Sequence, residues 1–153
     1  MKFLVSVIIA VVCLAGLSGR ASAQQPTVVN DRNAARMLLG SHKLSLQWIS
    51  WNYFGSANVT NVKGVYRIKG EQRGRGKSTD FVRIDGVITT ISPKEFKFEG
   101  MVEMQIDHIN GGQPCLREGE LTFAITKNRR YWRMQEMDNP CDMATDYVDI
   151  YFR

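Results

Sequence analysis

The sequence predicts an all-β protein in which an antiparallel meander of about seven or eight strands forms a small barrel, preceded by one short N-terminal helix. Three observations predict this class. Apolar and polar residues alternate along several segments, short turn-forming segments separate them, and helical periodicity occurs once, before residue 40. A two-sheet β-sandwich is the alternative, because alternation identifies the apolar face of each strand but does not determine whether the sheet closes.

The first 23 residues have the pattern of an export signal. Lys2 supplies a positive charge, an apolar run extends from Phe3 to Leu17, and the small residues of Ala21-Ser22-Ala23 suit a signal peptidase. The apolar run is too short to span a bilayer. We therefore expect cleavage after Ala23, a single mature domain of residues 24–153 with no transmembrane segment, and a periplasmic or secreted location.

Cleavage would also remove Cys13 and leave one pair of cysteines, Cys115 and Cys141. Exported proteins commonly join such a pair, because the compartments that receive them are oxidising. A disulfide stabilises a fold mainly by restricting the unfolded chain. The sequence therefore predicts a Cys115–Cys141 disulfide.

The mature chain begins with a polar segment followed by the predicted helix. Asn30 is placed to cap a helix over residues 31–39, and Gly40 is placed to end it. The first strand is expected over residues 43–51, with Trp48 on the same side as the leucines that precede it.

The next predicted strands cover residues 65–69 and 81–91, and a polar loop over residues 70–78 separates them. The pair Asp85-Gly86 lies inside the second of these strands. It predicts either a β-bulge or a tight turn at that point.

The clearest strand lies between Phe96 and Asp107, where apolar residues alternate with charged or polar ones. Gly100 falls on its apolar side, where the strand can curve. A loop follows over residues 110–114. The remaining strands are expected at residues 121–125, 131–137 and 147–152.

A resemblance to known families follows from this order of elements. The capped helical turn that ends at Gly40, the aromatic first strand with Trp48, the strand meander and a disulfide that reaches the C-terminal region together resemble the lipocalins and the wider calycin group. This resemblance implies a barrel that binds a small, mostly apolar ligand in its mouth. The segment from Tyr131 to Asp142 is also similar to small secreted bacterial proteins of unknown function.

A ligand-binding barrel needs large apolar side chains that point inward from its strands. His108 continues the alternation of the long strand on its inward side, so we expect it near the barrel mouth. The candidate ligand-binding residues are Leu46, Trp48, Phe96, Phe98, Met104, His108 and Phe123.

Charge is unevenly distributed along the chain. The net charge of +5 falls by two units when Lys2 and Arg20 are removed with the export signal. The region from Lys63 to Arg83 is basic, and the region from Glu136 to Asp149 is acidic. The candidate anion-binding patch consists of Arg67, Lys69, Arg73, Arg75 and Lys77. The alternative is a solvated hairpin whose charges only prevent association with other strands.

No motif predicts catalysis, a cofactor or a metal. The run Gly76-Lys77-Ser78 lacks the glycine spacing of a phosphate-binding loop, and two histidines are too few for an evident zinc site. Few aromatic residues accompany the basic region, so nucleic acid is not an expected partner. We expect an exported, non-catalytic protein that binds a small apolar ligand. A protein that contacts an envelope partner through its surface is the alternative, and a hydrolytic enzyme is the least favoured.

Overall fold

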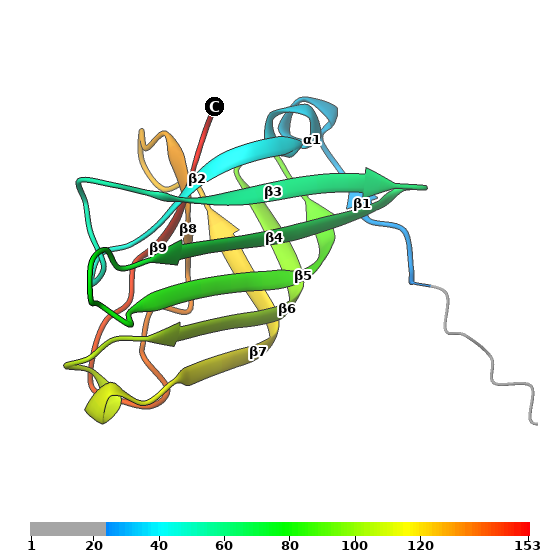
Figure 1. Ribbon diagram of the computed structural model, residues 1–153. Coiled ribbons are helices and arrows are strands. Elements are labelled where there is room, and N and C mark those ends of the chain that lie inside the picture. The colour runs from blue at the N-terminus through cyan, green and yellow to red at the C-terminus, as the bar shows by residue number, and fades with distance from the viewer. Residues whose placement is uncertain (1–23) are drawn as a thin grey trace, which may run out of the picture.

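The computed structural model describes residues 24–153 as one closed barrel of eight strands with a ninth strand outside it (Figure 1). The predicted export signal lies outside the described residues. The elements are β1 (Val28–Val29), α1 (Arg32–Leu38), β2 (Gly40–Leu46), β3 (Gly55–Val62), β4 (Val65–Arg73), β5 (Phe81–Ile91), β6 (Glu95–Gln105), the short 3-10 helix η1 (Asn110–Gly112), β7 (Cys115–Ala124), β8 (Tyr131–Met134) and β9 (Val148–Tyr151). The predicted all-β barrel is confirmed.

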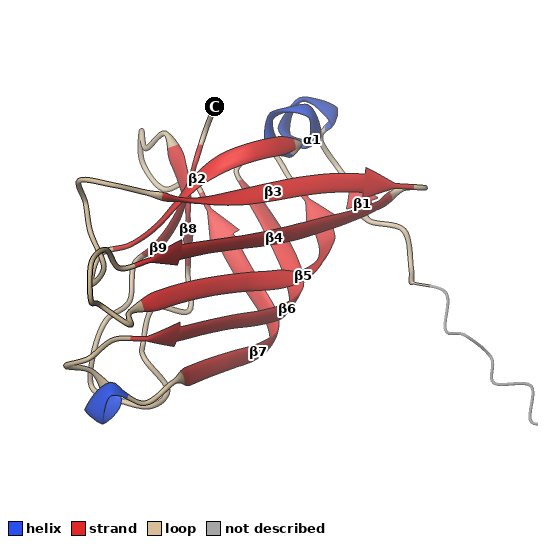
Figure 2. Ribbon diagram, in the orientation of Figure 1, coloured by secondary structure: helices blue, strands red, loops and turns tan. Residues whose placement is uncertain are grey.

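The barrel is an antiparallel meander, because each strand from β2 to β9 pairs with the next one along the chain (Figure 2). Pairing of β2 with β9 closes the ring, with Leu44 opposite Ile150. In such a meander, successive connections lie at alternate ends of the barrel. One end, here called the long-loop end, carries the connections at residues 47–54, 74–80, 106–114 and 135–147.

The other end of the barrel is covered by α1. Ala34, Ala35 and Leu38 of this helix are buried in the core. The helix precedes the barrel strands but follows β1, which pairs in parallel with the end of β5. Its N-cap is Asp31, not Asn30, because the Asp31 carboxylate accepts a hydrogen bond from the Ala34 N–H at 2.6 Å.

The interior is filled by aromatic and aliphatic side chains. Phe96 and Phe123 stack with ring centroids 5.1 Å apart, and Phe98 meets Phe123 edge to face. Phe98 and Phe123 are 0% exposed and Phe96 is 1% exposed. This burial leaves no water-sized space against these rings, so the centre of the barrel is a packed core.

Two glycines allow β5 and β6 to approach closely. Gly86 lies opposite Gly100, and a Cβ atom on Gly86 would lie 2.3 Å from Cε2 of Phe98. The Phe98 ring therefore occupies the volume of the missing side chains. The bulge or turn expected at Asp85-Gly86 was wrong, because the ladder is continuous there and the register shifts between Ile88 and Thr90.

Several strands differ from the prediction. β7 begins at Cys115 instead of Leu121, and β8 ends at Met134 instead of Met137. The sequence pattern did not predict β3, whose inward side chains include the small Ala57 and Val59. β2 ends at Leu46, which places residues 47–51 in a loop. β4 continues through the expected loop to Arg73, since Gln72 is satisfied inside the barrel by the Leu46 N–H and the Tyr53 carbonyl.

Within residues 24–153, no helix is both long and apolar enough to cross a membrane.

Candidate functional site

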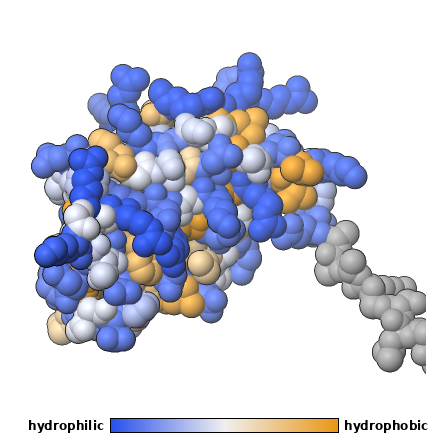
Figure 3. Space-filling view, viewed as in Figure 1, coloured by the Kyte–Doolittle hydropathy of each residue, from blue (hydrophilic) through white to orange (hydrophobic). Residues whose placement is uncertain are grey.

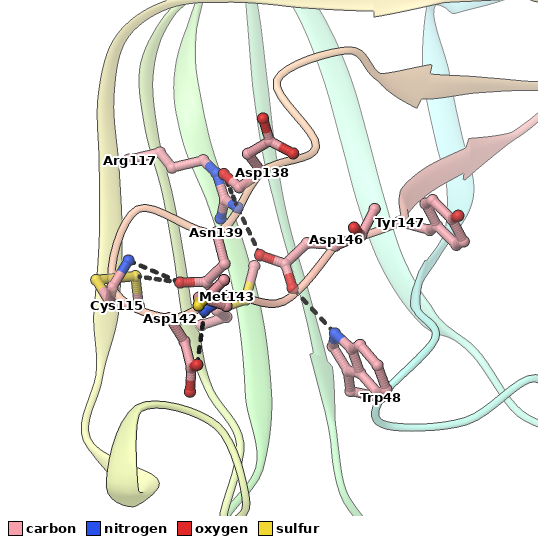
Figure 4. Close-up of polar contacts among 12 residues, drawn as sticks. Trp48, Cys115, Arg117, Asp138, Asn139, Asp142, Met143, Asp146 and Tyr147 are labelled. Carbon is pink, nitrogen blue, oxygen red and sulfur yellow. Dashed lines mark hydrogen bonds and ion pairs between the residues drawn. A yellow bond between two sulfur atoms is a disulfide. The ribbon is translucent and has the colours of Figure 1, made fainter.

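The long-loop end of the barrel is organised by a buried polar network (Figure 4). Arg117 points inward from β7 and donates to the Asp146 carboxylate and to the Asp138 carbonyl. The other Asp146 oxygen accepts a hydrogen bond from the Trp48 indole at 2.9 Å. Asp146 is 0% exposed and Arg117 is 6% exposed, so the network joins β7 to two loops across the barrel end.

The segment from residue 138 to residue 147 closes this end and is attached at several points. The predicted Cys115–Cys141 disulfide is present and joins it to the start of β7. The Asn139 side chain accepts a hydrogen bond from the Cys141 N–H at 2.8 Å. The Asp142 carboxylate accepts the Asn110 N–H at 2.6 Å, which fixes the segment to η1.

Hydrogen bonds from two backbone N–H groups stabilise the ionised form of Asp142. The bonds from Asn110 and Met143 lower the pKa of this carboxyl from its ordinary value of 3.8. Asp142, at the rim of the barrel end, therefore stays ionised to a lower pH than an ordinary aspartate does.

A hollow of about 570 Å³ lies on the outside of this network and is called here the end hollow. Trp48 forms part of its wall, and the Trp48 and His108 rings meet edge to face at 5.8 Å. Trp51 is 52% exposed and Met143 is 103% exposed at its rim. The hollow therefore presents two large apolar groups to solvent at one place, and apolar groups that gather on a surface mark interaction sites.

The structure separates the candidate ligand-binding residues into two groups. Leu46, Phe96, Phe98, Met104 and Phe123 lie together in the packed core, each no more than 1% exposed. Their role in ligand binding stays a prediction.

Trp48 and His108 lie elsewhere, in loops at the long-loop end. The expected strand position of Trp48 was wrong because β2 ends two residues earlier. The expected inward position of His108 was also wrong, since β6 ends at Gln105 and the His108 side chain is 60% exposed beside Asp107.

The candidate anion-binding patch is partly neutralised by acidic neighbours on the outer face of the sheet. Asp85 lies 3.8 Å from Arg67 and 3.4 Å from Lys69, measured between charged atoms. Glu71 pairs with both Arg73 and Arg83 at 2.8 Å. Burial by itself would raise the pKa of Glu71, but these two guanidinium groups lower it overall.

The two remaining members of the patch lie in the connection between β4 and β5. Arg75 stacks over the Tyr53 ring at 4.0 Å, and Lys77 is exposed. Figure 3 shows a largely hydrophilic outer face on this side of the barrel. Anion binding by the patch stays a prediction.

Sequence reasoning missed the residues that form the end hollow with Trp48. The aromatic residues at positions 48, 51, 53 and 54 were a sequence signal for Trp51. No local pattern indicated Met143, Tyr147 or Arg117. Among residues 24–153, no group of three His, Cys, Asp or Glu side chains is placed to hold a metal ion.

Comparisons with known proteins extend along the described barrel. The model of the PM1083 family matches residues 26–152. A relative from Pasteurella multocida (strain Pm70), described as uncharacterized protein PM1083, is 40% identical over 136 residues. The aligned region covers 89% of this chain and 87% of the relative. No solved structure gives a significant match.

Proposed function

This chain belongs to the PM1083 family, and we propose that it is an exported, non-catalytic binding protein whose contact surface is the long-loop end of the barrel. The partner is an envelope or extracellular protein that covers the apolar rim of the end hollow. Export proceeds by cleavage after Ala23, and the Cys115–Cys141 disulfide supports an oxidising location.

The exposed rim of the end hollow is the observation that carries this proposal. Trp51 and Met143 extend from two different loops and border the same hollow. Aromatic residues and methionine are enriched in protein interfaces, where their burial dominates the binding energy. The loops beneath them are held by a disulfide and a buried ion pair, so little order has to be gained on binding.

The packed interior supports a surface mode of binding over an internal ligand. Phe98, Met104 and Phe123 fill the positions that such a ligand would occupy, and each is no more than 1% exposed. An internal ligand would have to displace these side chains from a close-packed core, which is destabilising.

Crosslinking from single positions tests the contact surface. A photoreactive phenylalanine analogue would replace Trp51, Met143 or, as a matched control, Val62. Val62 is also exposed and apolar, at 62%, but lies at the opposite end of the barrel. We expect positions 51 and 143 to crosslink to the same partner in cells and position 62 not to. Equal products from all three positions, or none from the first two, would overturn the proposal.

Mass spectrometry tests export and the internal-ligand alternative. The intact mass of the protein from the periplasm or medium should correspond to a chain that begins at Gln24 with the disulfide formed. Retention of the N-terminal segment would contradict export. A bound molecule of constant mass in native spectra, retained after Trp51→Ser/Met143→Ser substitution, would favour a ligand inside the barrel.

A further inference from the structure

The seam where β2 meets β9 is shorter than the strands that form it. Only Leu44, Ser45 and Leu46 of β2 pair with β9, although β2 begins at Gly40. Beyond the ladder, the His42 ring bridges the two strands. Its nitrogens lie 2.9 Å from the Tyr151 carbonyl oxygen and 2.7 Å from the Leu38 carbonyl oxygen. A depression lies on the outside of the seam, lined by residues 41–43 of β2 and by Tyr151 at the end of β9. Figure 1 shows β9 running beside β2 at this seam.

This depression, here called the seam groove, has a volume of about 550 Å³. Its aromatic walls include Phe54 and Tyr151, whose ring centroids are 5.1 Å apart at an interplanar angle of 69°. Burial raises the pKa of Tyr151, so its hydroxyl stays neutral. The groove therefore offers two aromatic rings set at an angle to each other, neither of which carries a negative charge.

The charged side chains that line the seam groove are all cationic. They are Lys43, Arg130 and Arg153, and no Asp or Glu is among the lining residues. None of the ion pairs among residues 24–153 includes Lys43 or Arg130. The Lys43 ammonium lies 5.1 Å from the centre of the Phe54 ring, which places positive charge directly beside the aromatic wall.

The basic region from Lys63 to Arg83 differs from the seam groove, because several of its cations are in ion pairs. Arg67, Lys69 and Arg73 of β4 each lie within 4.0 Å of a carboxylate. Charges that already have partners attract an external anion less strongly than unpaired ones do. Lys43 and Arg130 of the seam groove therefore differ from these three β4 residues in having no carboxylate partner among the described residues, although they are far apart in the sequence.

We propose that the seam groove binds a small organic anion that carries a carboxylate, sulfonate or phosphate group on a flat apolar body. The flat body lies against Phe54 and Tyr151, and the anionic group lies between Lys43 and Arg130. A guanidinium and an ammonium can both donate charge-assisted hydrogen bonds to such a group. This site shares no lining residue with the end hollow, although Phe54 lies in the same connection, residues 47–54, as Trp51.

Two fluorescent probes that differ by one charged group test the proposal. Anilinonaphthalenesulfonate has a flat aromatic body with a sulfonate, and phenylnaphthylamine has the same body without it. We expect saturable binding of the anionic probe at one site and much weaker binding of the neutral probe. Affinity for the anionic probe should fall as salt rises from about 50 to about 500 mM, because the cations are partly exposed to solvent.

Substitutions on the surface locate the site. Lys43→Ser/Arg130→Ser should weaken binding of the anionic probe about tenfold by removing both charge-assisted contacts. The matched control Arg73→Ser/Arg75→Ser removes the same amount of charge elsewhere and should change affinity less than about twofold. Trp51→Ser/Met143→Ser should leave the affinity for the anionic probe unchanged, since these residues border the end hollow.

Three results would overturn the proposal. The first is equal affinity of the parent for the two probes. The second is an unchanged affinity of Lys43→Ser/Arg130→Ser for the anionic probe, and the third is a lowered affinity of Trp51→Ser/Met143→Ser for that probe. Lys43 and Arg130 are both exposed, so Lys43→Ser/Arg130→Ser should unfold at the same temperature as the parent. A matching unfolding temperature shows that a change in affinity does not come from unfolding.

Discussion

Arg133 and Asp149 lie directly opposite each other on β8 and β9 and form a two-point ion pair. Nε and Nη2 of Arg133 each lie 2.7 Å from a different oxygen of Asp149. Asp149 is 0% exposed, and the Arg133 guanidinium is covered by the Tyr147 ring at 4.1 Å. A polar pair is thus buried on the outer side of the barrel wall, beneath tyrosine side chains.

Removal of one partner of this pair should be strongly destabilising. We expect Asp149→Ala to lower the free energy of unfolding by about 3–5 kcal/mol, because it leaves Arg133 buried without its counter-charge. Burial raises the pKa of Asp149 despite the opposing charge of Arg133, so burying the carboxylate is itself costly. The double variant Arg133→Met/Asp149→Leu should therefore recover most of the loss in urea unfolding. A double variant less stable than Asp149→Ala would contradict this account.

The disulfide should contribute to stability through the unfolded chain. Cys115 and Cys141 are 26 residues apart, and loops of this size correspond to about 3 kcal/mol. We expect Cys115→Ala/Cys141→Ala to lower the free energy of unfolding by about that amount. Treatment of the parent with a thiol reductant should produce a similar loss and should leave the double variant unchanged. No difference between reduced and oxidised parent would show that the loop is already restricted in the unfolded state.

The close approach of β5 and β6 should not tolerate a side chain at Gly86. A Cβ atom there would contact the Phe98 ring at 2.3 Å and the Glu99 carbonyl oxygen at 2.5 Å. We expect Gly86→Ala to lower the free energy of unfolding by about 1–3 kcal/mol, because the added methyl group overpacks this site. Thermal unfolding measures the change. Gly76→Ala is the control, because a Cβ atom at that loop position meets nothing within 4 Å. Its positive φ alone costs about 1 kcal/mol, so Gly86→Ala should be the more damaging of the two.

Acid should weaken the attachment of the segment at residues 138–147 to η1. The folded pKa of Asp142 is lower than its ordinary value of 3.8, so the carboxylate favours the folded state above that pH. The contribution is lost as pH falls through the folded pKa. We expect Asp142→Asn to unfold at a lower temperature than the parent at pH 7 and the difference to shrink below about pH 4.

A control substitution separates this effect from general charge removal. Glu118 is exposed on the outer side of β7, so Glu118→Gln should show no such pH-dependent difference from the parent. A difference between Asp142→Asn and the parent that is constant from pH 7 to pH 2 would show that the carboxylate charge is not involved.

Much of the fold was predictable because strand patterns are local. The alternation in β5 and β6 is carried by large apolar residues, and the predicted strand at residues 81–91 coincides with β5. The strand β3 was missed because Ala57 and Val59 are small, so burial on its inner face leaves a weak apolar signal. The end of β2 was also missed, because apolar residues continue from Leu46 into the loop.

The candidate site was only partly predictable, since its members come from distant parts of the chain. Trp48 was identified as aromatic and important, but its contact with Asp146 spans 98 residues of sequence. Met143 lies in a segment that is attached to the rest of the barrel by the disulfide and by the contact of Asp142 with Asn110. No local pattern carries this information, because it arises from packing between loops.

The sequence by itself determined the strand periodicity and the all-β class and predicted the Cys115–Cys141 pairing, because these follow from local alternation and composition. Only the tertiary structure decided that β9 pairs with β2, that the interior is packed, and that Lys43 and Arg130 face one groove. The physical reason is that burial and charge neutralisation depend on which distant side chains meet. A basic residue on β4 lies beside a carboxylate on the neighbouring strand, whereas the cations of the seam lie where the β2–β9 ladder ends, and no Asp or Glu is among the described residues that line their groove.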